Sequence, residues 1–230
     1  MKILIVSATK SEIIQTMSYF SDKNQIKDNL WLANFLNNEI IFLITGIGSY
    51  ATIYELTKVL SGYEFDMIIN AGIAGAYDPS LRIGDVVCVR TEEIGDLGVN
   101  DRGEFKTVFD KKFLDPNDFP FIDKKLVNPY IDKTEFSPNL KHVKGLTVNS
   151  VSGDINAIEK LISKFDPQVE SMEGAAFFYV CLIEKQKFLE IRSISNYVEH
   201  RNRNNWQILK AINTLNENLK MLIFEIIKSF

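Results

Sequence analysis

The sequence has few of the residues that build metal sites and disulfide frameworks. Its 230 residues include two cysteines and two histidines. Cys88 and Cys181 lie in apolar surroundings and form no Cys-x-x-Cys pair, so we expect reduced thiols in a cytoplasmic protein. His142 and His200 have no Cys or His nearby at ligand spacing, which argues against the common zinc sites. We therefore expect no metal.

Blocks of one charge and long hydrophobic runs are also missing. Lys and Arg number 26 against 30 Asp and Glu, which gives a net charge of −4. A slightly acidic chain without a basic block binds phosphate backbones poorly, so we do not expect a nucleic-acid partner. The apolar run Ile3–Val6 is too short for a signal peptide, and no run could cross a bilayer. We therefore expect no membrane partner.

Length and composition predict one globular domain. At about 150 residues per domain, the chain corresponds to roughly 1.5 domains. Its 46% hydrophobic and 24% charged residues are ordinary for a soluble globular chain. No linker, repeat or low-complexity tract interrupts the sequence. We expect residues 1–230 to form a single domain.

Strand and helix patterns alternate along this domain. The expected strands are Lys2–Val6, Leu30–Leu36, Glu39–Ile44, Met67–Asn70, Ile83–Val89, Leu146–Val151 and Phe188–Ser193. The expected helices are Lys10–Phe20, Ser49–Ser61, Ile155–Phe165, Met172–Lys185 (opened by Glu170 and Glu173) and a long one from near Trp206. Asp110–Asn139 is predicted to be a long loop. This alternation predicts an α/β fold of three layers, with a central mixed, largely parallel sheet flanked by helices.

Glycine-rich turns follow two of the expected strands. Gly46-Ile47-Gly48 superficially matches a dinucleotide-binding turn, but Asn70 stands where the acidic residue at the end of the next strand is required. The alternative is a tight strand-to-helix turn. The small residues Ala71–Ala76 either leave room for a ligand at the strand end or form a crowded turn.

Charged and polar residues at strand and helix ends complete the candidate site. Glu12 follows the first strand and is either an exposed helix residue or part of a site. Glu173, among small residues, either caps its helix or holds a ligand hydroxyl. Arg192 and Asn196 end a strand that otherwise stays apolar, so they meet a ligand or incur a desolvation cost.

Taken together, these segments resemble the nucleoside phosphorylase and nucleosidase superfamily over nearly the whole chain. The resemblance covers the start with Glu12, Thr45–Gly48, Asn70–Gly75, Leu81–Val87, Val151–Asp154, Ser171–Ala176 and Arg192–Asn196. Within it, Glu93–Gly98, Ser171–Phe177, Ser193–Glu199, Arg201–Arg203 and Trp206 are most similar to the futalosine hydrolases.

The resemblance implies a role for each matching residue. Glu12 matches the carboxylate that activates the attacking water, and Arg192 matches an arginine beside it. Glu173 matches the acceptor of the ribose hydroxyl hydrogen bonds, with Met172 against the sugar. Asn196 occupies the purine-facing position, which is an aspartate in the related methylthioadenosine/S-adenosylhomocysteine nucleosidases. The other residues expected to bind substrate are Gly72, Ile73, Gly153 and Asp154.

The chemistry of Asn196 favours a 6-oxopurine. Its amide offers a donor and an acceptor, which suits N7 or O6 of hypoxanthine, but it cannot supply a proton to adenine. Asn70 and Ile73 replace the phosphate-holding arginine and serine of microbial phosphorylases, so hydrolysis is favoured over phosphorolysis. Ile73 also departs from the serine of the nucleosidases.

The resemblance and this chemistry together imply a futalosine hydrolase that releases hypoxanthine and dehypoxanthine futalosine in menaquinone biosynthesis. No cofactor is expected, the substrate partner is a small purine nucleoside, and a homodimer or higher homo-oligomer is expected. The alternatives are a nucleosidase for inosine or methylthioadenosine/S-adenosylhomocysteine, a purine nucleoside phosphorylase, and a non-catalytic nucleoside-binding protein.

Overall fold

The structure is a computed structural model that describes residues 1–20, 22–131 and 139–229. The helices are α1 (Lys10–Tyr19), α2 (Ser49–Leu60), α3 (Ile155–Phe165), α4 (Gly174–Ile183) and α5 (Ile208–Ser229), with a 3₁₀ turn at Arg203–Asn205. The strands of the N-terminal half are β1 (Lys2–Ser7), β2 (Lys23–Lys27), β3 (Leu30–Phe35), β4 (Asn38–Ile44), β5 (Met67–Ala76), β6 (Val86–Ile94), β7 (Gly98–Asp101) and β8 (Glu104–Thr107). Those that follow are β9 (Phe121–Ile122), β10 (Lys125–Val127), β11 (Lys141–Thr147), β12 (Val169–Ser171) and β13 (Phe188–Tyr197).

The main sheet is mixed, and its middle closes on itself. The hydrogen-bonded order is β2-β3-β4-β1-β5-β12-β11-β6-β10-β9, and β13 pairs with both β5 and β6. β1 runs parallel to β4 and β5, whereas β13 runs parallel to β5 and antiparallel to β6. Because β13 joins β5 to β6, the strands β5, β12, β11, β6 and β13 form a closed ring, referred to below as the strand ring.

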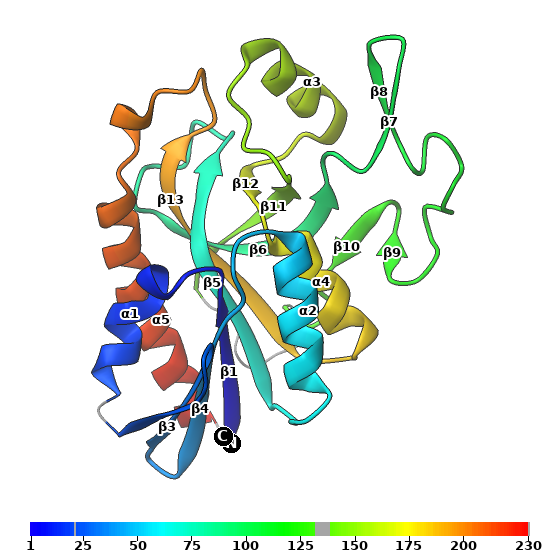
Figure 1. The fold of residues 1–230 in the computed structure, drawn as a ribbon. Coiled ribbons are helices and arrows are strands. Elements are labelled where there is room, and N and C mark those ends of the chain that lie inside the picture. The colour runs from blue at the N-terminus through cyan, green and yellow to red at the C-terminus, as the bar shows by residue number, and fades with distance from the viewer. Residues whose placement is uncertain (21, 132–138, 230) are drawn as a thin grey trace.

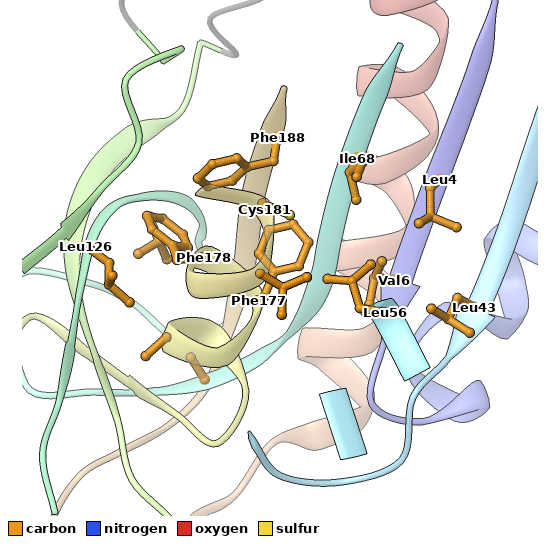
Figure 2. Packing of buried hydrophobic residues seen from close by; sticks show 14 of the residues in the cluster. Leu4, Val6, Leu43, Leu56, Ile68, Leu126, Phe177, Phe178, Cys181 and Phe188 are labelled. Carbon is orange, nitrogen blue, oxygen red and sulfur yellow. The ribbon is translucent and has the colours of Figure 1, made fainter. Parts of the chain in front are cut away.

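Helices cover both faces of the sheet, as the alternating pattern predicts (Figure 1). Ile3 and Ile5 of β1 pack in a cluster with residues of α1 and α5. The alternate residues Leu4 and Val6 pack in a second cluster with residues of α2 and α4, shown in Figure 2. This period-two division is the expected result of a strand buried on both sides. The three-layer α/β prediction is confirmed.

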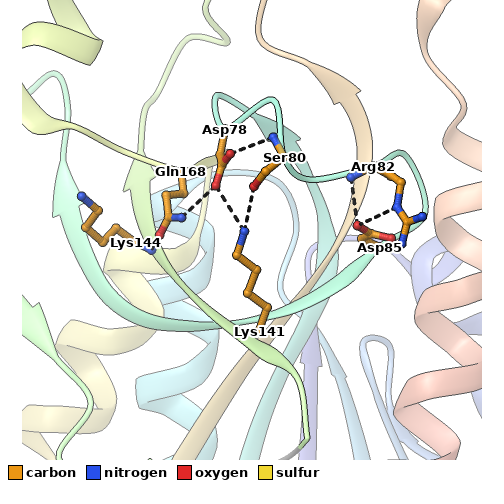
Figure 3. Close-up of polar contacts among 7 residues, drawn as sticks. All are labelled: Asp78, Ser80, Arg82, Asp85, Lys141, Lys144 and Gln168. Carbon is orange, nitrogen blue, oxygen red and sulfur yellow. Dashed lines mark hydrogen bonds and ion pairs between the residues drawn. The ribbon is translucent and has the colours of Figure 1, made fainter.

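A polar cluster fixes the turn after β5 (Figure 3). The Lys141 ammonium donates to Asp78 at 3.3 Å and to Ser80 at 2.9 Å, and the Gln168 amide donates to Asp78 at 3.0 Å. Hydrogen bonds from Ser80, and then from Gln168, hold the pKa of Asp78 well below its usual value. These bonds join the turn to the start of β11 and to the residue before β12.

The expected bounds of several strands were wrong. The strand expected at Leu146–Val151 is β11, which runs from Lys141 to Thr147 and so begins and ends earlier than predicted. Its first half has no apolar run, since Lys141 and Lys144 make polar contacts at the surface. β6 begins at Val86 instead of Ile83 and continues to Ile94. The polar residues after Val89 were not predicted to be part of the strand, but Glu92 among them is buried.

The two strands that carry most of the site are longer than predicted. β5 continues through its small residues to Ala76, and β13 continues to Tyr197, because the two strands pair along their length. Glu170 belongs to β12 and not to the helix that follows. β2, β12 and the β7–β8 hairpin were not predicted.

The predicted loop Asp110–Asn139 contains two short strands. β9 pairs with β10, and β10 pairs with β6 at the edge of the main sheet. Residues 132–138 of this segment lie outside the described residues. Across the described ranges, no helix has the length and apolar character needed to span a membrane.

Candidate active site

The first βα unit places a carboxylate at the end of β1. Glu12 lies in the first turn of α1 and is 8% exposed. Its Oε2 accepts hydrogen bonds from the Thr9 amide at 2.9 Å, the Thr9 hydroxyl at 2.7 Å and the Ser7 hydroxyl at 3.3 Å. Its Oε1 accepts one from the Ile73 amide of β5 at 3.2 Å. One oxygen thus completes the start of the helix, and the other reaches the neighbouring strand.

A glycine of β5 leaves room for Arg192 to lie close to Glu12. Gly72 and Arg192 are register partners on parallel strands. A Cβ at Gly72 would lie 2.1 Å from Arg192 Nη1 and 3.1 Å from Glu12 Oε1. Only a residue without a side chain leaves this space to the guanidinium and the carboxylate.

The start of α4 supplies a second carboxylate. Glu173 is the N-cap residue of α4 and is 8% exposed, and its Oε1 accepts a hydrogen bond from the Gly48 amide at 2.8 Å. Gly48 has a φ of 92°, which favours glycine. The next residue, Ser49, donates to the Met172 carbonyl at 3.3 Å. The glycine turn therefore positions Glu173 and follows the tight-turn interpretation.

The buried carboxyl groups near Arg192 outnumber its single positive charge. Burial opposes its positive charge, but Glu190, Glu173 and Glu12 outweigh burial and raise the pKa of Arg192. Burial raises the pKa of Glu173, and this is opposed chiefly by the charge of Arg192. Glu92 is a fourth buried carboxyl group, adjacent to Glu190. One guanidinium among four carboxyl groups makes a site that repels anions and stabilises positive charge on a bound molecule.

Asn196 lies farther along β13 and is 8% exposed. A register shift between Ile194 and Asn196 places it beside Gly75. Its Oδ1 accepts a hydrogen bond from Ser195 Oγ at 2.7 Å, and its Nδ2 donates to the Tyr197 carbonyl at 3.0 Å. The second hydrogen of Nδ2 and a second lone pair of Oδ1 are left for a ligand.

The remaining predicted site residues divide between two places. Gly72 and Ile73 contact Glu12, and Met172 is half-buried directly before Glu173. Gly153 and Asp154 instead lie at the start of α3, where they line an open cleft of about 1410 Å³. The Asp154 carboxylate accepts a hydrogen bond from the Ala157 amide at 2.9 Å and so caps α3.

A buried carboxylate anchors the segment that leads into α3. The Glu170 carboxylate accepts hydrogen bonds from Tyr77 Oη at 2.5 Å and from the amide and hydroxyl of Ser152 at 3.0 and 2.6 Å. Burial, followed by the charge of Glu170, raises the pKa of Tyr77. Glu170 thus connects Ser152, which precedes α3, to Tyr77, which follows β5. It lies in β12, so it is not an acidic residue of the first turn of α4 that stabilises the helix dipole.

Comparison with known proteins agrees with this fold. The family model described as "Phosphorylase superfamily" matches residues 3–228. The chain belongs to the phosphorylase superfamily.

Relatives in this superfamily carry two names at similar distances. A 5'-methylthioadenosine/S-adenosylhomocysteine nucleosidase of Tolumonas auensis is 29% identical over 85% of this chain and 86% of that protein. A futalosine hydrolase of Thermus thermophilus is 27% identical over 80% of this chain and 81% of that protein. The structure of a Helicobacter pylori futalosine hydrolase has a TM-score of 0.80 at 20% identity, with 97% of each chain covered, and therefore supports the fold.

Sequence reasoning missed two buried acidic residues of this superfamily member. Glu190 and Glu92 are 0% and 1% exposed inside the strand ring. Glu190 interrupts the apolar run of Phe188, Leu189 and Ile191, and that interruption was the available signal. Glu92 stands among polar residues, so no signal in the sequence indicated that it is buried.

Proposed function

We propose that this protein is a purine nucleosidase that hydrolyses the bond between ribose and base. The observation that carries the proposal is that the buried carboxyl groups of Glu12 and Glu173 both lie near one buried arginine, Arg192. Glu12 Oε1, beside Arg192, accepts the proton of a water whose oxygen attacks C1′. The glycosidic electron pair leaves with the base nitrogen, and positive charge develops on the sugar.

Glu173 serves the sugar in this proposal. A buried carboxylate accepts hydrogen bonds from the ribose 2′- and 3′-hydroxyls, and these strengthen as the ring becomes cationic. The surplus of carboxyl groups supports water over phosphate as the nucleophile, because the charges of Glu12, Glu173 and Glu190 act on Arg192 and also repel a phosphate dianion.

Within this activity we infer futalosine as the substrate, with hypoxanthine as the released base. The support is Asn196, whose amide pairs with N7 or O6 of a 6-oxopurine and cannot protonate adenine. Ser195 fixes the amide by donating to its Oδ1. Both activities named among the relatives share the sugar chemistry, so the base-facing residue carries this inference.

The test is release of base from futalosine, inosine and methylthioadenosine, with and without phosphate. We expect hypoxanthine from futalosine, no dependence on phosphate, and little adenine. A mismatched buried hydrogen bond costs about 1–3 kcal/mol, or roughly 5- to 150-fold in rate. In Asn196→Asp, the ratio of hypoxanthine to adenine release should fall. An unchanged ratio, with all substrates slowed equally, would show that Asn196 does not read the base.

We further propose that the protein acts as a homodimer whose interface includes α2. Tyr50 and Tyr54 are 84% and 62% exposed on this helix. α2 begins at the turn that holds Glu173 and Met172, so a partner seated there would lie near the site. The resemblance also suggests that the partner's Asp110–Asn139 segment covers the substrate.

A further inference from the structure

Two carboxyl groups that the proposed reaction does not use lie inside the strand ring. Glu92 comes from β6 and Glu190 from β13, and both are fully buried. In the part of the chain that the structure describes, the buried polar side-chain atoms without a hydrogen-bond partner are Asn70 Nδ2, Glu190 Oε2 and Arg192 Nη2. Glu190 Oε2 and Arg192 Nη2 belong to two residues of β13 that form an ion pair with each other. Such atoms destabilise a fold, so this cluster has a use other than stability.

Glycines allow the two carboxyl groups to meet. A Cβ at Gly174 would lie 2.3 Å from Glu92 Oε1 and 2.7 Å from Glu190 Oε1. A Cβ at Gly145 of β11 would lie 2.1 Å from Glu92 Oε1. Both distances from the Gly174 Cβ are measured from one point, so Glu92 Oε1 and Glu190 Oε1 lie no more than about 5 Å apart. Two ionised carboxylates this close and this buried repel each other, whereas a proton on one of them removes the repulsion and supplies a hydrogen-bond donor.

Polar partners fix both ends of the pair. Glu92 Oε2 accepts a hydrogen bond from Thr147 Oγ1 at 2.8 Å, and Thr147 in turn accepts one from the Ala175 amide of α4 at 2.7 Å. At the other end, Glu190 Oε1 accepts from Arg192 Nε at 2.8 Å. A chain of bonds therefore runs from the start of α4 to the guanidinium.

We propose that Glu92 and Glu190 share a single proton, and that this pair positions Arg192 near Glu12 and Glu173. With one proton, the pair carries one negative charge and neutralises the guanidinium. Without it, two like charges would lie in contact away from water, which costs far more than an exposed pair. Arg192, held at Nε, keeps Nη1 beside Glu12. Glu92 and Glu190 are thus positioning residues, and this second role rests on the proposed function.

The surroundings of the pair favour holding the proton. Burial raises the pKa of both Glu92 and Glu190, and each is raised further by a neighbouring carboxylate. The titratable and charged groups that face the pair are Arg192 and Glu173, Glu12 across Arg192, Glu93 on β6, and the thiols of Cys88 and Cys181. Burial raises the pKa of both thiols, so Arg192 is the cation that opposes these carboxyl groups.

Glu92→Gln tests the shared proton without substrate. The folded pair holds its proton above the usual pKa of 4.5, whereas the unfolded chain releases it near that value. The native free energy of unfolding therefore falls as pH rises above 4.5 toward the raised pKa. Glutamine keeps the donor permanently, so Glu92→Gln should show a shallower fall and lose one protonated-carboxyl band in the infrared spectrum. Glu39→Gln, at an exposed ion pair with Lys2, is the matched control.

An unchanged slope and an unchanged infrared spectrum in Glu92→Gln would overturn the shared proton. Should Glu92→Gln fail to fold, the double variant Glu93→Gln with Glu173→Gln serves instead, because it lacks the two other carboxyl groups near the pair whose pKa is raised. It should still show a protonated-carboxyl band at neutral pH, and absence of that band would reject the pair. These measurements need no substrate, so they test the shared proton even if the protein releases no base.

Glu190→Gln tests the positioning of Arg192. Loss of the ion pair should lower kcat by about 10- to 100-fold, the size seen for partners that orient a working group, with a smaller change in KM. The acid limb of the kcat profile should shift, because Arg192 then faces only Glu12 and Glu173. A folded Glu190→Gln protein with native kcat and pH profile would reject the positioning role. Failure of the native protein to release any base would reject the proposed function but not the shared proton.

Discussion

Glu12 uses its two carboxylate oxygens differently. Oε2 is saturated by donors from Ser7 and Thr9 at the start of α1, whereas Oε1 shares the space over Gly72 with Arg192. The side chain is thus both a helix-start residue and a candidate base. The alternative of an exposed helix residue is wrong, because Glu12 is 8% exposed.

Glu12→Gln should remove most base release and leave the fold intact. A neutral amide cannot take the water's proton, and loss of a general base costs about 10²- to 10⁴-fold in kcat. The amide also meets donors from Thr9, so the free energy of unfolding should fall by about 1–3 kcal/mol. Steady-state base release and urea unfolding measure the two effects. Near-native kcat would reject Glu12 as the base.

Glu173 should set an acid limb on the pH profile. Because burial raises its pKa above 4.5, Glu173 takes up a proton at higher pH than an ordinary glutamate, and kcat/KM should decline there as pH falls. Glu173→Gln should lose this limb. The native enzyme should also prefer ribose to 2′-deoxyribose substrates, and Glu173→Ala should not. Equal discrimination by both proteins would show that Glu173 does not contact the 2′-hydroxyl.

At the scale of elements, the site depends on the close approach of β5 and β13. β5 presents Gly72 to Arg192 and Gly75 to Asn196, so two large polar side chains of β13 lie against backbone. The small residues that first indicated room for a ligand or a crowded turn make room for a neighbouring strand.

Gly72→Ala should be damaging, since its Cβ would lie 2.1 Å from Arg192 Nη1. We expect a loss of about 1–3 kcal/mol in the free energy of unfolding and displacement of Arg192, with lower kcat. Gly62→Ala is the matched control, because its Cβ would meet only the Val59 carbonyl at 4.0 Å. Similar effects of the two substitutions on kcat would contradict this assignment.

Substitutions of Asp154 distinguish a helix-capping role from a substrate-binding role at the start of α3. If its carboxylate serves only Ala157, then Asp154→Ala should cost about 1 kcal/mol of unfolding free energy, and Asp154→Asn should cost little, because asparagine caps helices equally well. Turnover should survive both changes. A large fall in kcat/KM for both would instead support substrate binding.

For the whole molecule, the exposed aromatic face of α2 predicts association. Light scattering at assay concentration should give a dimer, and Tyr50→Glu with Tyr54→Glu should shift it toward monomer and reduce activity. Leu209→Glu, at a residue 79% exposed on α5, is the control and should not change the mass. A fully active native monomer would contradict the proposal.

The alternation of strands and helices and the two covering layers could be predicted from the sequence alone, because periodicity is a local signal. Glu12, Glu173 and Arg192 stood out as charged residues near strand and helix ends, but the roles proposed for them come from the resemblance to the superfamily. The tertiary structure decided how β13 joins β5 to β6, where β11 begins and which way Asn196 faces. It also decided that Glu92 and Glu190 come close together beside Gly174. Strand order, register shifts and contacts between distant carboxyl groups arise from pairing across the sheet, and no local pattern encodes them.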